Sequence, residues 1–251
     1  MRSLFRSRPA APLVEPVPTV FPEIEGADIA AVFSGKRVAG DFYDSVRVSP
    51  ERVLFGLLDV AGRREDNRGI LIEAQTVFRT FGAQLFAASD INESNAMTEL
   101  SLRINRAIID SSHGVRSCPA FIGCYHEKFG TLCYTNAGHT AGLLRDSKGI
   151  AELKSTGLPL GLFSHAPSDA PTVGLEKGAA LLLVSRGVVE CGHKEKSDLE
   201  FGLERVKPFL QAAPSSSARA LCVSIVNEIS DFSGHTPLCD DRTALALVRT
   251  V

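Results

Sequence analysis

The stretch VAGDFYDSVRVSPERVLFGLLDVAG, residues 38–62, contains two apolar runs that predict neighbouring β-strands. These runs are VRV and VLFGLL, and residues 49–51, Ser-Pro-Glu, form a turn between them. Such a hairpin brings Asp41, at the start of the first strand, close to Asp59, at the end of the second. Two carboxylates repel each other unless a cation lies between them, so the hairpin predicts a site for a hard metal ion. The alternative is that these aspartates only cap turns.

The bulk properties exclude several classes of protein. The chain has 251 residues, a net charge of −2 and 44% hydrophobic residues, which is typical of a globular protein with a substantial core. The scattered basic residues do not favour nucleic-acid binding, and the apolar runs are shorter than the ~20 residues that cross a membrane. The six cysteines form no CxxC pair and lie in apolar patterns, which predicts reduced, core-filling thiols. A cytoplasmic protein is expected.

The order of elements predicts an α+β fold. Residues 1–26 are rich in proline and predict a flexible leader, with binding to a partner as the alternative role, followed by one domain over residues 27–251. Amphipathic periodicity predicts helices over residues 70–85, 97–108, 199–210 and 218–229. Short β-rich runs joined as hairpins separate the second helix from the third, and a last strand ends the chain. Hairpins without βαβ crossovers predict antiparallel sheets covered by helices on their outer faces.

The sequence also predicts how the first two helices begin. The charged string RREDNRG, residues 63–69, predicts a loop before the first helix. Ser94 or Thr98 is the expected cap at the start of the second helix.

The chemical motifs are informative mainly by elimination. The chain has no GxxxxGK[ST], no GxGxxG, no GxSxG and no cysteine followed six positions later by arginine. Its histidines do not fall at the spacing of zinc ligands. The remaining candidates are Asp41, Asp59 and the pair Asp240–Asp241, each at a strand end or an adjoining turn. Oxygen ligands of this kind favour Mg²⁺ or Mn²⁺, which suit hydrolysis of a phosphate ester.

Seven short motifs, taken together, resemble the metal-dependent protein serine/threonine phosphatases of the PPM type. In order, these motifs are GDFYD, LLDVAG, NAGH, LPLG, LLLVSRGVVE, FGLERV and DDRTALALV. The bacterial SpoIIE-like branch, which includes the RsbU-like phosphatases of partner-switching pathways, is the most similar.

The resemblance implies an α/β/β/α sandwich with one or two Mn²⁺ or Mg²⁺ ions at one end. Asp59, the carbonyl group of Val60 and Asp240 would bind the metal, and Asp41 would act directly or through ordered water. Asp241 is a weaker candidate. By resemblance, the partner would be a phosphorylated regulatory protein of the anti-sigma-antagonist type.

Two departures from the family pattern put catalysis in doubt. Where family members have His-Gly after DVSG, this chain has Arg63 and Arg64, which would either recruit a phosphorylated partner or be solvated. Where they have a metal-binding aspartate in TDG or SDG, this chain has Arg186 in the string SRG. Arg186 would either pair with the aspartates in place of an ion or extend into solvent.

Three readings of the function therefore stay open. The chain is an active phosphatase, a phosphatase of reduced activity with one metal ion, or a pseudophosphatase that binds a protein partner without turnover. Tyr43, Asp44 and His139 are expected to serve the structure rather than the chemistry.

Overall fold

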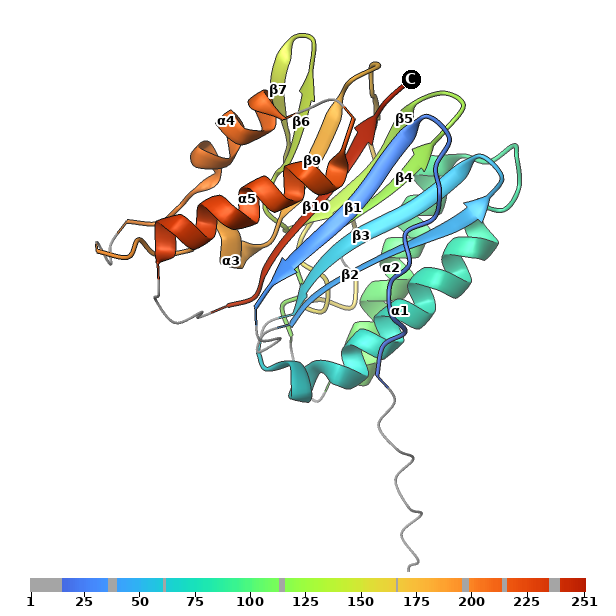
Figure 1. Ribbon diagram of the computed structural model, residues 1–251. Helices are drawn as coiled ribbons and strands as arrows, with labels where there is room; N and C mark the ends of the chain where they lie inside the picture. Colours follow the sequence, from blue (N-terminus) through green and yellow to red (C-terminus); the bar gives the residue numbers. More distant parts are fainter. Residues whose placement is uncertain are drawn as a thin grey trace, which may run out of the picture.

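The computed structural model describes residues 15–35, 40–60, 62–112, 116–165, 167–195, 199–213, 216–234 and 240–251. Two five-stranded antiparallel sheets pack face to face, and helices cover their outer faces (Figure 1). Sheet A contains, in spatial order, β1 (Ala27–Ser34), β10 (Arg242–Arg249), β9 (Ala180–Val184), β6 (Gly142–Asp146) and β7 (Gly149–Leu153). Sheet B contains, in spatial order, β2 (Gly40–Ser49), β3 (Arg52–Val60), β4 (Ala120–His126), β5 (Thr131–Ala137) and β8 (Thr172–Gly174).

The helices divide between the two outer faces. Sheet B is covered by α1 (Arg64–Phe86) and α2 (Glu93–Ser111), and sheet A by α4 (Leu203–Ala212) and α5 (Ala218–Ser233). The one-turn helix α3 (Arg186–Val189) follows β9. The predicted α/β/β/α sandwich is therefore confirmed. Within the described residues, no helix is long and apolar enough to cross a membrane.

Three buried apolar layers stabilise the sandwich. One lies between sheet B and α1 with α2, one lies between sheet A and α4 with α5, and the third lies between the two sheets. In β3 and β9 every residue is buried, because each strand has one face against helices and the other against the opposite sheet. The five cysteines of the described ranges are all buried, as expected of core-filling residues.

The helix boundaries differ from the prediction in three places. Most of the charged string 63–69 is the first turns of α1 rather than a loop, because Glu65 and Asp66 at a helix N-terminus complement its dipole. The N-cap of α2 is Asn92, whose side chain accepts a hydrogen bond from the backbone N–H of Asn95. Neither Ser94 nor Thr98 is therefore the N-cap residue. The third predicted helix begins later, at α4, because Gly202 before it has a φ of +73°.

The second half of the predicted leader packs on the body of the protein. Residues 1–14 lie outside the described residues, whereas residues 15–26 run from α1 past β2 towards the start of β1 (Figure 1). Phe21 and Ile24 pack against the apolar layer between the sheets. Residues 15–26 are therefore not the free tail that their proline content predicts.

Candidate active site

The β2–β3 hairpin places Asp41 directly opposite Asp59 in the antiparallel register. Both residues are nearly buried, with 5% and 3% of their surface exposed. Gly40 lets the strands approach at this end, because a Cβ atom there would lie only 2.2 Å from the carbonyl oxygen of Val60. The hairpin expected from the sequence thus brings two carboxyl groups into one corner of the molecule.

Sheet A supplies the other wall of this corner. The hydroxyl group of Thr243 in β10 donates a hydrogen bond of 2.7 Å to Asp41 Oδ2. The backbone N–H of Thr243 donates to Ser185 Oγ at 3.0 Å, and Ser185 Oγ donates to the carbonyl oxygen of Asp241 at 3.3 Å. Gly187 permits this approach, because a Cβ atom there would lie 2.1 Å from the same carbonyl oxygen. Residues of both sheets therefore form the corner.

Arg186 points at the carboxylates rather than into solvent. Its Nε atom lies 3.5 Å from Asp59 Oδ2, and its Nη2 atom lies 3.2 Å from Asp240 Oδ2. Glu190, one turn further along, has Oε2 at 3.9 Å from Arg186 Nε. Of the two orientations that the sequence left open, the structure has the inward one. The side chain is still 45% exposed, so a ligand in solution can reach it.

Burial dominates the electrostatics of the corner. It raises the pKa of Asp41 to about 8, although hydrogen bonds from Ser185 and Thr243 oppose the increase. Burial also raises the pKa of Asp59 to about 6, against the opposing effect of the Arg186 guanidinium group. Asp41 Oδ1 is buried and accepts no hydrogen bond of ordinary geometry from the described residues. The corner thus carries more buried acid than its own donors compensate.

The predicted metal ligands do not form a ready-made ion site in this arrangement. Asp41, Asp59, the Val60 carbonyl group and Asp240 gather in the corner, but Arg186 pairs with two of the three carboxylates. Among the described residues, no group of three or more His, Cys, Asp or Glu side chains is placed to hold a metal ion. A divalent ion between Asp59 and Asp240 does not fit while the guanidinium group is there, because like charges repel.

Three polar residues of the corner escaped the sequence reasoning. Thr243 and Ser185 hold Asp41 and the start of β10, and Asn67 in α1 donates a hydrogen bond of 3.3 Å to the carbonyl oxygen of Val60. Each lies inside a string quoted in the sequence analysis, but the string does not reveal which residue it contacts. Thr243 and Asp41, for example, are 202 positions apart.

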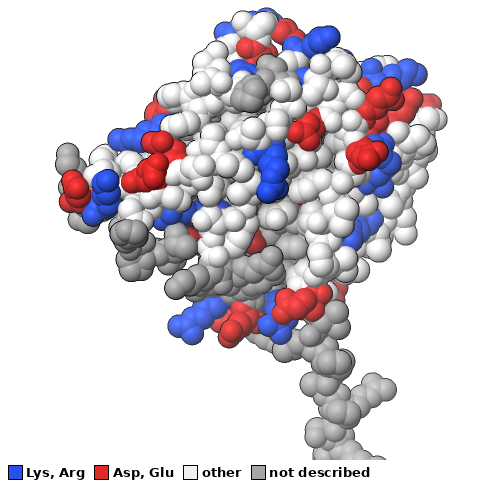
Figure 2. Space-filling view, viewed as in Figure 1, with Lys and Arg blue, Asp and Glu red and all other residues white. Residues whose placement is uncertain are grey.

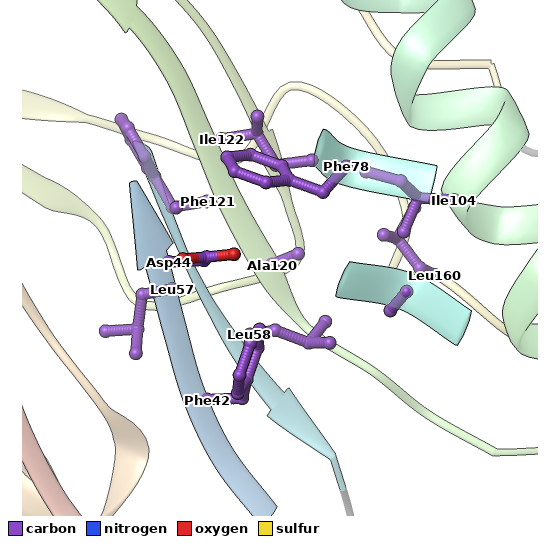
Figure 3. Close-up of a pocket in the computed structure, with 12 residues that line it drawn as sticks. Phe42, Asp44, Leu57, Leu58, Phe78, Ile104, Ala120, Phe121, Ile122 and Leu160 are labelled. Atoms are coloured by element: carbon purple, nitrogen blue, oxygen red, sulfur yellow. The ribbon is translucent and has the colours of Figure 1, made fainter. Parts of the chain in front are cut away.

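Asp44, three positions after Asp41 on β2, has a different environment. Its two oxygens accept hydrogen bonds from Arg79 at 2.7 and 2.9 Å and from Gln75 at 3.0 Å. Figure 3 shows its carboxyl group among apolar side chains that line a cavity of about 30 Å³, room for about one water molecule. These contacts join β2 to α1, which agrees with the structural role expected of Asp44.

His139 and the two N-terminal arginines of α1 complete the predicted set. The backbone N–H of His139 donates to Asn136 Oδ1 at 2.8 Å, which fixes the turn, and complete burial lowers the pKa of the imidazole to about 4. Arg63 is exposed at the N-cap position of α1. The side chain of Arg64 lies outside the described residues.

Comparison with known proteins shows which proteins this chain resembles. The family model described as "Stage II sporulation protein E (SpoIIE)" matches residues 49–250. Protein IcfG of Synechocystis sp. is 24% identical over 253 residues, covering 93% of this chain and 39% of IcfG. Phosphoserine phosphatase RsbU of Bacillus subtilis is 26% identical over 243 residues, covering 93% of this chain and 66% of RsbU. The chain thus spans less than two thirds of each relative.

A solved structure shares the fold. The SiaA-PP2C domain of Pseudomonas aeruginosa superposes with a TM-score of 0.72 at 18% sequence identity. The superposition covers 88% of this chain and 84% of that domain. The two-sheet sandwich is therefore the same in both.

Proposed function

This chain belongs to the SpoIIE family, and we propose on that premise that it is a phosphatase acting on phosphoserine or phosphothreonine in a protein. The observation that supports the proposal most directly is the corner in which Asp41, Asp59 and Asp240 gather at the junction of the two sheets. The similarity to a phosphoserine phosphatase, RsbU, supports the same reaction class.

The proposed substrate is a phosphorylated regulatory protein of a bacterial partner-switching pathway, of the anti-sigma-antagonist type, in the cytoplasm. The surface is consistent with a protein partner. In the view of Figure 2, the described Lys, Arg, Asp and Glu side chains are interspersed, and much of the centre of the face is uncharged. A nucleic-acid ligand would instead favour a continuous basic patch.

Turnover would require Arg186 to leave Asp59 and Asp240. The four oxygen donors of the corner, from Asp41, Asp59, Val60 and Asp240, would then favour Mn²⁺ or Mg²⁺, with Asp241 as a weaker candidate. Such an ion would supply positive charge that polarises the attacking water and the phosphoryl oxygens. The released guanidinium group of Arg186 suits a phosphate, which it can bind through two parallel hydrogen bonds.

One observation favours a second function, phosphoprotein binding without turnover. Arg186 already neutralises part of the charge of Asp59 and Asp240, at 3.5 and 3.2 Å, and its guanidinium group stands where a metal ion would neutralise the same charge. A pseudophosphatase of this kind would retain the phosphate-binding arginine and lose the ion.

A manganese titration separates the two functions. We would measure hydrolysis of p-nitrophenyl phosphate and of a phosphoserine peptide by the wild type, Arg186→Asp and Asp59→Asn, with Mn²⁺ binding followed by calorimetry. An active phosphatase predicts Mn²⁺-dependent turnover by the wild type that Asp59→Asn abolishes. Binding without turnover predicts a silent wild type and activity gained in Arg186→Asp.

The remaining outcomes are also informative. Weak turnover with one bound ion would indicate the one-metal enzyme. If Arg186→Asp binds Mn²⁺ but both proteins are silent, the corner is not a phosphatase centre and the first proposal is wrong.

A further inference from the structure

Residues 15–23, here called the N-terminal strap, are fastened to α1 and β2 by side chains. The side-chain amide of Gln75 in α1 accepts from the N–H of Val17 at 2.7 Å and donates to its carbonyl oxygen at 2.8 Å. The hydroxyl group of Thr19 donates to the carbonyl oxygen of Tyr43 in β2 at 2.7 Å. Phe21 stacks on the ring of Tyr43, with centroids 6.1 Å apart. The strap is thus held at several points along its length.

A single buried carboxyl group ties these fastenings together. Asp44 accepts from Gln75 at 3.0 Å and from Thr19 at 3.2 Å, while Arg79 holds it from α1. Asp44 is only 3% exposed. The position of the strap is therefore set by the same polar group that joins β2 to α1, rather than by loose surface contact.

The strap forms one side of a groove that shares Asp41 with the candidate active site. The groove has a volume of about 230 Å³ and is lined by Val17, Pro18, Phe33, Phe42, Tyr43 and Asp41, together with two further strap residues. A cavity of about 150 Å³ is large enough to bind benzene, so the groove can hold a branched or aromatic side chain. Its lining is apolar or uncharged apart from one acid.

That acid connects the groove to the chemistry. Asp41 is 95% buried, since only 5% of its surface is exposed, and it both lines the groove and stands opposite Asp59. Its Oδ1 atom accepts no hydrogen bond of ordinary geometry from the described residues. Asp41 is therefore the residue at which the groove meets the carboxyl groups of the corner.

We infer that the groove between the N-terminal strap and β2 receives the segment of the phosphoprotein substrate that flanks the phosphorylated residue, and that it selects an apolar side chain there. The inference rests on the proposed function. Two features favour a peptide over a small molecule. The groove shares Asp41 with the corner, and it lies between the strap and β2, the edge strand of sheet B, so a peptide in it would extend along that edge beside the strap.

The spacing of the selected residue follows from chain geometry. An extended peptide advances about 3.3 Å per residue, so an apolar side chain in the groove lies within a few residues of a phosphoserine at Asp41. The groove beside the strap would therefore select substrates by a side chain near the phosphoserine, a selection that the carboxylates of the corner do not provide. Small phosphate esters would not reach it.

The test uses nine-residue phosphoserine peptides of alanine in which one leucine is moved from four residues before to four residues after the phosphoserine. KM is measured with the full chain, and Kd is measured in parallel by fluorescence anisotropy. We expect one leucine position to lower both by about tenfold, the effect of partly burying that side chain. Val17→Asp should abolish the preference, because it places a charge in the groove.

The chain offers a matched control on the same strap. Val20 is 77% exposed and does not line the groove, so Val20→Asp should keep the preference for leucine. Hydrolysis of p-nitrophenyl phosphate should be unchanged in Val20→Asp, and circular dichroism confirms that both variants fold. Equal behaviour of the two variants, or affinity that does not depend on the position of leucine, would overturn the inference.

Other results would show whether the proposed phosphatase activity or the proposed role of the groove is wrong. Leucine-dependent Kd values without turnover of any peptide would support the groove and contradict the phosphatase. If Val17→Asp instead raises p-nitrophenyl phosphate turnover, the strap is an inhibitory cover. If it dissociates a dimer in sedimentation experiments, the groove holds a second copy of the chain. Either of these last two results would overturn the inference.

Discussion

Asp41 and Asp44 lie three positions apart on β2, and both are at least 95% buried. The two carboxyl groups differ in the hydrogen-bond donors that surround them. Asp44 is held by an arginine, a glutamine and a threonine, and it also accepts a hydrogen bond from the N–H of Ser45. Asp41 has hydroxyl donors and one oxygen without a well-formed hydrogen bond in the described structure. Hydrogen bonds and an ion pair compensate the burial of Asp44, whereas the burial of Asp41 is compensated only in part.

This difference separates a structural acid from a functional one. A buried carboxylate that is fully paired joins elements of the fold, as Asp44 joins β2, α1 and the N-terminal strap. A buried carboxylate that is left short of donors costs free energy, and such costs cluster at functional sites. Position along the strand does not distinguish Asp41 from Asp44, whereas the donors around them do.

The largest effect should come from breaking the compensated site. Replacing Asp44 by alanine leaves Arg79 without its partner and removes the group that fastens the strap. We expect the free energy of unfolding to fall by about 3 kcal/mol, as when one member of a buried ion pair is removed. Urea denaturation measures the change.

A double-mutant cycle gives the control for this prediction. Arg79→Met and the double variant with Asp44→Ala should together show strong coupling between the two residues. Additive losses would mean that the ion pair contributes little and that Asp44 is not the structural hub.

A smaller effect should appear at His139, whose Nε2 atom is buried without a hydrogen-bond partner in the described structure. Its pKa is lowered from 6.5 to about 4, so the unfolded chain binds a proton that the folded chain excludes between these values. This contribution to stability is complete above pH 6.5 and is lost as the pH falls towards 4. It should amount to about 2 kcal/mol between pH 6.5 and pH 5.

The measurement compares thermal or urea unfolding of the wild type and His139→Gln over that pH range. The difference between the two proteins should shrink or reverse as the pH falls, because glutamine does not titrate. A difference independent of pH would show that the imidazole binds protons equally in the folded and unfolded chains, so that burial does not lower its pKa.

The fold was largely accessible from the sequence, because apolar periodicity reports burial. The hairpin of β2 and β3, the antiparallel strands and the pairs of outer helices all follow from it. The string 63–69 was misassigned for the same reason. Periodicity detects apolar positions, and the first turns of α1 are formed by charged residues that interact with the helix dipole.

The candidate site was accessible only in part. The proximity of Asp41 and Asp59 is a local consequence of a hairpin, so the sequence predicts it. The inward orientation of Arg186 depends on Asp240, 54 positions away, and so the sequence left it open. The strap was missed because its proline content suggests disorder, while its order comes from Gln75 and Thr19.

The smallest effect on stability is expected at Asp41. Replacing it by asparagine keeps the shape and the acceptor for Thr243 but removes a poorly compensated buried acid. At pH 8 we expect the free energy of unfolding to rise by about 1 kcal/mol, while any phosphatase turnover falls. Urea denaturation and phosphopeptide hydrolysis on the same preparations test both. A loss of stability close to that of Asp44→Ala would show that Asp41 is structural. A gain in stability with loss of turnover means that the chain retains this acid at a cost to its fold, because the reaction requires it.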